Sequence, residues 1–133
     1  MVKQGRVIKG TVVSLMIVGM CAEGASAVGN ISDTEYSAYS TNGIYTNQRE
    51  KRDYTSSYIY HKGNVGINVS VYSRGVNCSL NGSAYSVNVN EEKLIPNLVK
   101  EKGGVDCYLF LRQKASAAYT LYGLWSPDSI NIK

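Results

Sequence analysis

The chain has 133 residues, enough for one domain with a single hydrophobic core. Hydrophobic residues make up 44% of it and charged residues 18%, which excludes an intrinsically disordered chain and a multi-pass membrane protein. With 1 histidine and 3 cysteines, one copy cannot assemble a cage of several histidines or a four-cysteine zinc site. We therefore expect neither a metal ion nor a cofactor.

Residues 1–27 have the pattern of a secretory signal peptide. Three basic residues near the start precede an apolar run over residues 11–22, and small residues at 25–27 are typical of a cleavage site. The apolar run is too short for a permanent membrane-spanning helix, which needs about 20 residues. We expect cleavage after Ala27 and secretion. The alternatives are an uncleaved anchor and a lipid-modified Cys21.

The mature chain, residues 28–133, is close to neutral. Cleavage would remove half of the formal net charge of +4 and leave about +2, because three basic residues and one acidic residue are lost. The remaining basic residues are scattered, so we do not expect nucleic-acid binding. The exception is the cluster at residues 48–53, which mixes both signs. We interpret it as a solvated loop, with a protease-processing site of the Arg-x-Lys-Arg form as the alternative.

The residue pattern predicts short strands throughout the mature chain. Short strands at 35–39 and 43–46 flank a turn, and alternation over 53–60 places Tyr54, Tyr58 and Tyr60 on one face of a strand. Residues 65–72 show the clearest alternation of apolar and polar residues. A turn at Arg74-Gly75 leads to a short strand at 76–80, and Asn81-Gly82 predicts a type I′ hairpin into residues 83–89.

The second half of the chain continues this pattern after one interruption. Residues 90–102 contain Pro96 and break the alternation, so a short helix and an ordered loop are both open there. Strands at 105–112 and 117–123 then predict a second hairpin. About six to eight short antiparallel strands with frequent turns favour an all-β fold, a small β-sandwich.

Two cysteines, Cys78 and Cys107, remain after cleavage. Each shares a strand face with apolar residues, so both thiols should point into the core. In an oxidising compartment only one intramolecular pairing is possible, and we predict a disulfide between the two sheets, worth about 3–4 kcal/mol on the chain-entropy model. A catalytic thiol is the alternative.

No pair of residues has the spacing of a catalytic site, so we expect no enzyme activity and assign no catalytic residue. The alternative is a small secreted hydrolase in which His61 acts as the general base with Glu35 or Glu50 as its partner.

All 11 tyrosines lie in the mature chain. Rigid aromatic faces suit the recognition of a protein or a sugar, although tyrosines can also simply favour strand formation. If a face of the sheet binds a ligand, the candidate residues are Tyr54, Tyr58, Tyr60 and Tyr72, with Trp125 as a further candidate.

Residues 122–129, Tyr-Gly-Leu-Trp-Ser-Pro-Asp-Ser, resemble the closing Gly-x-Trp-Ser-Pro-Asp-Ser stretch of an uncharacterised family of small secreted proteins from Gram-positive bacteria. The resemblance implies a secreted all-β domain in a bacterium and brings no activity with it. The family pattern has no cysteine pair. Trp125 follows Gly123 and is expected to close one end of the sandwich.

We therefore expect a secreted, non-enzymatic binding protein. Its partner would be a component of the cell envelope or an extracellular protein, contacted through the tyrosine-bearing sheet. The alternative is a secreted bacteriocin-like toxin that acts on a neighbouring cell. The ligand itself is not encoded in any motif.

Overall fold

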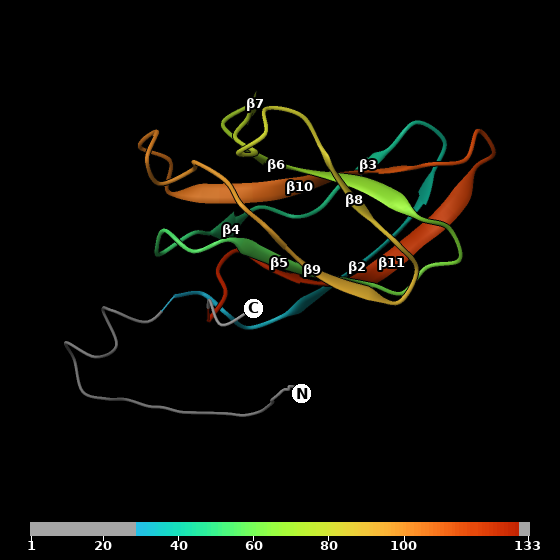
Figure 1. The fold of residues 1–133 in the computed structure, drawn as a ribbon, viewed down its shortest axis with the longest axis horizontal. Helices are drawn as coiled ribbons and strands as arrows, with labels where there is room; N and C mark the ends of the chain where they lie inside the picture. Colours follow the sequence, from blue (N-terminus) through green and yellow to red (C-terminus); the bar gives the residue numbers. More distant parts are fainter. Residues whose placement is uncertain (1–28, 131–133) are drawn as a thin grey trace.

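The computed structural model describes residues 29–130 as a sandwich of two antiparallel sheets, as the strand pattern predicts (Figure 1). The predicted signal peptide, with its cleavage site after Ala27, lies outside the described residues. The strands are β2 (Thr34–Ser40), β3 (Ile44–Tyr45), β4 (Arg49–Glu50), β5 (Ser57–His61), β6 (Ile67–Ser73), β7 (Val76–Asn77), β8 (Tyr85–Val87), β9 (Glu91–Ile95), β10 (Asp106–Gln113) and β11 (Tyr119–Ser126). Residues 29–130 contain no helix that could span a membrane.

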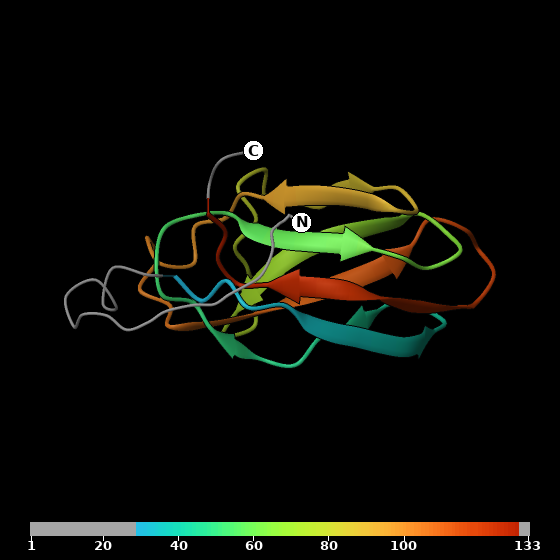
Figure 2. The same cartoon turned by 90° about the horizontal axis from the view of Figure 1, so that it is seen from below.

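The four-stranded sheet has the order β2-β11-β5-β9, and the six-stranded sheet is built on the central pair β6 and β10. β3 and β4 pair with β10, whereas β7 and β8 both pair with β6 (Figures 1 and 2). Most successive strands alternate between the sheets, so the contacts that close the fold join residues far apart in the sequence.

The core lies between the sheets and follows the two-residue period of the strands. In β6 the inward residues Ile67, Val69 and Val71 are fully buried. Leu109 and Leu111 of the neighbouring strand β10 are buried beside them on the same face of the sheet. Full burial of each such side chain stabilises the fold by about 1.5–3 kcal/mol. The four-stranded sheet contributes the aliphatic and aromatic residues Ile59, Ile95, Leu121 and Trp125.

Both predicted hairpins are wrong. β7 and β8 do not pair with each other; they pair with opposite ends of β6, and Cys78 and Ser79 between them are buried. A type I′ turn needs a positive φ at both central residues, but only Gly82 has one (73°), while Asn81 does not. β10 and β11 lie in different sheets, so the link between them crosses the sandwich.

Two further segments differ from their predicted structure. Segment 90–102, for which the sequence predicts a helix or a loop, begins with a strand instead. Glu91–Ile95 forms β9, which pairs with β5 at the edge of the four-stranded sheet. Pro96 follows the last residue of this strand. The strand predicted over 53–60 begins only at Ser57, which leaves Tyr54 in the preceding bend.

The predicted disulfide is also wrong, because Cys78 and Cys107 are free thiols. Both are buried in the core, as the strand pattern indicates. However, Cys78 continues β7, where its amide donates to Val71 O (2.7 Å), and Cys107 lies in β10 on the other side of β6. Two strand spacings separate the cysteines by roughly 10 Å, whereas the two Cα atoms of a disulfide lie within about 7 Å of each other.

We therefore predict two free, unreactive thiols in the folded mature chain. Burial raises the pKa of Cys107 to about 12, which suppresses the nucleophilic thiolate and disfavours the catalytic-thiol alternative. Alkylation without reductant should add no adduct to the native protein and two adducts to the chain unfolded in denaturant, as read by intact mass. Absence of adducts after unfolding would show that the two sulfurs are bonded.

Candidate functional site

The structure does not bring the five candidate binding residues to one face. Tyr58 and Tyr60 lie on the outer face of the four-stranded sheet, and Tyr72 lies on the outer face of the six-stranded sheet. Tyr54 is exposed in the bend before β5, and the Trp125 side chain is buried in the core with 1% exposure. The parity of a single predicted strand could not show that Tyr58 and Tyr72 belong to opposite faces.

The largest aromatic cluster of the described residues lies on the outer face of the six-stranded sheet. We call it the aromatic patch, and it consists of Tyr45 in β3, Tyr72 in β6, and Tyr108 and Phe110 in β10. Strand register sets it up, because Phe110 pairs with Tyr45 and Tyr108 pairs with Tyr72. These side chains have the opposite parity to the core residues of β10, so they point outward.

The rings of the aromatic patch hold one another in place. The ring centroids of Tyr45 and Phe110 are 4.8 Å apart, and those of Tyr72 and Tyr108 are 5.8 Å apart with an interplanar angle of 22°. Such pairs each contribute about 0.5–1.5 kcal/mol beyond the burial of their area. Tyr45 is 63% exposed, while the other three rings are half-buried against it and against one another. The result is an aromatic surface whose rings restrain one another.

The sequence contained a partial signal for this patch. Tyr108 and Phe110 alternate with the core residues of β10, and their outward position could be derived from parity. Tyr45 was missed because β3 has only two residues and its partner strand lies more than 60 residues further along the chain.

The outer face of the four-stranded sheet carries a shallow depression of about 230 Å³. The residues that line it carry both signs of charge, with Glu35 on β2 and Lys62 just after β5, and include Tyr122 and Leu124 of β11. The Lys62 ammonium lies 5.4 Å from the ring centroid of Tyr60, a cation–π contact. Through Lys62, Tyr60 thus lies beside a hollow of mixed polar and apolar lining, unlike the continuous ring surface of the aromatic patch.

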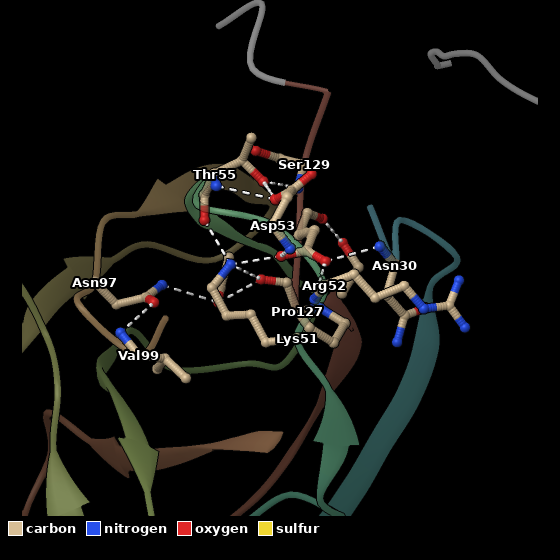
Figure 3. A network of polar contacts seen from close by, with 12 residues as sticks. Asn30, Lys51, Arg52, Asp53, Thr55, Asn97, Val99, Pro127 and Ser129 are labelled. Atoms are coloured by element: carbon tan, nitrogen blue, oxygen red, sulfur yellow. Dashed lines mark hydrogen bonds and ion pairs between the residues drawn. The ribbon is translucent and has the colours of Figure 1, made fainter. Parts of the chain in front are cut away.

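A buried ion pair, Lys51 with Asp128, joins the two sheets at one end of the sandwich (Figure 3). Lys51 Nζ lies 2.5 Å from Asp128 Oδ1 and also donates to Thr55 O (2.6 Å) and Pro127 O (3.0 Å). The backbone amides of Asn30 and Arg52 donate to Asp128 Oδ2 at 2.7 and 2.8 Å. We call these groups the Lys51–Asp128 clasp.

The clasp corrects the interpretation of residues 48–53 as a solvated loop or a protease site. Arg49 and Glu50 form β4, and the side chain of Lys51 is only 1% exposed. Arg49 donates to Trp125 O (3.0 Å) and Ser32 O (2.7 Å), and its guanidinium lies 5.4 Å from the Trp125 ring. A protease needs this segment extended and accessible, whereas the contacts of Arg49 and Lys51 fix it against the rest of the protein.

Hydrogen bonds set the charge of Asp128. Burial alone would raise its pKa, but the hydrogen bonds from Lys51, Asn30 and Arg52 outweigh burial and hold the pKa below its ordinary value of 3.8. The carboxyl group is therefore ionised at neutral pH and pairs with the ammonium.

His61, the candidate general base, is fully buried beside Tyr36. Its Nε2 lies 2.7 Å from Val65 O, and because a carbonyl can only accept, Nε2 carries the proton of the neutral ring. Nδ1 then accepts from the Tyr36 hydroxyl at 2.8 Å. Burial lowers the pKa of His61 and raises that of Tyr36. Both ring nitrogens are thus engaged in hydrogen bonds within the protein.

The described residues contain no cluster of three or more side chains that could hold a metal ion. The comparison with protein families matches residues 24–129 to the family described as "Protein of unknown function (DUF2712)". The chain belongs to this family. Searches of the curated proteins and of the solved structures find no significant match. The family assignment agrees with the expected resemblance to a domain of unknown function, and it carries no activity.

Removal of one member of the clasp should destabilise the fold strongly. Lys51→Met leaves the Asp128 carboxylate buried without its cation, which costs about 3–5 kcal/mol, measurable as a lower free energy of unfolding in urea. The double variant Lys51→Met with Asp128→Asn should cost less than the sum of the two single variants. The matched control is the exposed pair Arg52 and Glu50, whose removal should cost no more than about 1 kcal/mol. Equal effects at the two pairs would contradict this account.

Acid should destabilise the fold in a window that His61 defines. Its folded pKa is lowered, so below the ordinary value of 6.5 the unfolded chain binds a proton that the folded chain resists. The free energy of unfolding should fall as the pH decreases through the ordinary histidine pKa of 6.5. His61→Gln should flatten this loss and leave the later one, which begins below pH 3.8, where the unfolded chain protonates Asp128 before the folded chain does. A flat wild-type profile between pH 7 and 5 would refute the assignment.

Proposed function

We propose that this DUF2712 protein is exported and acts outside the cell as a non-enzymatic binding protein. The proposed binding surface is the aromatic patch, and the proposed ligand is a component of the cell envelope or an extracellular protein. The observation that carries the proposal is the patch itself: four mutually packed rings, from three strands, on the outer face of a sheet.

The physical support is the low cost of ordering this surface. A protein that binds through flexible side chains loses about 0.5–1.5 kcal/mol for each one that it immobilises. Here the rings already restrain one another, so less conformational entropy remains to be lost. Aromatic side chains in such settings supply large contact areas with few rotatable bonds. An apolar cluster that served only folding would be expected between the sheets, where the core already lies.

The support for export is the N-terminal segment, with its basic start, apolar run and small residues before Ala27. The closing stretch over residues 122–129 supports a Gram-positive source. In such a cell the exported protein would be in contact with the cell wall and with other extracellular proteins. These are the two classes of partner that we propose.

The test is retention of the purified mature protein by intact cells and isolated walls of its source organism, read by sedimentation. We expect retention of the wild type and at least about tenfold weaker retention of Tyr45→Ala and of Tyr72→Ala. Tyr39→Ala is the matched control, because Tyr39 is 69% exposed against 63% for Tyr45 and lies on the opposite sheet. Walls stripped of protein with a protease distinguish a protein partner from another envelope component.

Loss of retention in Tyr39→Ala but not in Tyr45→Ala would move the binding surface to the four-stranded sheet and overturn the assignment to the patch. Absence of any retention would overturn the envelope component as the ligand. Growth inhibition of other strains by the purified protein would support the toxin alternative instead.

A further inference from the structure

We propose that Lys51 and Asp128 condense to an intramolecular amide, an isopeptide bond, so that the clasp is a site of covalent self-modification. Lys51 directly follows β4 of the six-stranded sheet, and Asp128 follows β11 of the four-stranded sheet. The bond would therefore tie the two sheets together covalently at one end of the sandwich.

The first argument is proximity in a site that excludes water. Lys51 Nζ and Asp128 Oδ1 are 2.5 Å apart, and the two side chains are 1% and 0% exposed. Holding two reactants in contact converts a bimolecular condensation into an intramolecular one, with a large gain in effective concentration. The water that hydrolyses amides in solution has little access to this position, which favours the condensed product.

The second argument is the environment of the carboxyl group. The backbone N–H groups of Asn30 and Arg52 donate to Asp128 Oδ2 at 2.7 and 2.8 Å. Attack of an amine on Cγ places negative charge on this oxygen in the tetrahedral intermediate. Two fixed backbone donors at such distances form an arrangement like the oxyanion hole of acyl-transfer enzymes.

The third argument is the orientation of the amine. Thr55 O and Pro127 O accept from Lys51 Nζ at 2.6 and 3.0 Å, so the nitrogen cannot turn away from the carboxyl group. The carbonyl of Thr55 is itself held in place, because the Thr55 N–H donates to Asp53 Oδ1 at 2.9 Å.

The reaction starts from the charged pair and needs no oxidant or other reactant. One proton passes from the Lys51 ammonium to the Asp128 carboxylate, which leaves a neutral amine and a neutral acid. The Nζ lone pair forms a bond to Cγ, a proton moves from nitrogen to the departing hydroxyl, and the Cγ–Oδ1 bond breaks. The products are the amide and one water molecule. Removal of two charges from a buried site favours this outcome.

The test is the intact mass of the purified, folded mature chain. We expect a mass lower than the calculated one by one water, about 18 Da, because the pair is held in reactive contact. Proteolysis should yield one branched peptide that joins the segments around Lys51 and Asp128, with no tryptic cleavage after Lys51. The loss should be absent in Lys51→Met and retained in the matched control Lys62→Met, whose lysine lies exposed beside Tyr60.

The calculated mass for the whole wild-type population, after prolonged incubation of the folded protein, would overturn the proposal and leave an ion pair only. A water loss that persists in Lys51→Met would also overturn it, because the loss would then arise elsewhere. The mass of wild-type protein decides the question even where the Lys51 variant fails to fold. None of these outcomes depends on the ligand of the aromatic patch.

Discussion

The buried contact between Lys51 and Asp128 constrains more of the structure than any other single interaction among the described residues. A charge without water must be paired and hydrogen-bonded, or its burial costs several kcal/mol. The acceptors and donors around the pair come from three segments: Asn30 at the start of the fold, Arg52 and Thr55 between β4 and β5, and Pro127 after β11. Satisfying one ion pair therefore fixes the path of three segments and the place where the two sheets meet.

The same requirement explains why β4 exists at all. Its two residues pair with β10 over Asp106 and Cys107, a short ladder that would be marginal alone. Arg49 anchors it to the backbone around Trp125, and the next residue enters the clasp. The segment around the clasp and the core are thus linked through Trp125. Its indole packs in the core and is also contacted by the Arg49 guanidinium.

The distribution of the aromatic residues follows from which face of each strand is buried. Tyr36 is turned inward and pairs its hydroxyl with His61, so the polar atom that comes with a buried tyrosine is satisfied. Tyr45, Tyr72 and Tyr108 are turned outward on the other sheet, where their rings pack against one another. β10 carries both functions at once, because its inward residues build the core and its outward residues build the aromatic patch.

The sequence by itself determined the all-β class, the alternation of β6 and β10, and the burial of both cysteines, because these follow from a local two-residue period. It also indicated the motif that contains Asp128 and the outward parity of Tyr72. Only the tertiary structure decided which strands pair and which distant side chains come into contact. Cys78, just after β7, and Cys107, in β10, belong to the same side of the sandwich. Tyr58 and Tyr72 occupy opposite outer faces, and Lys51 pairs with an acid 77 residues away. Periodicity reports which side of a strand is buried, but strand pairing depends on long-range contacts that no local pattern records.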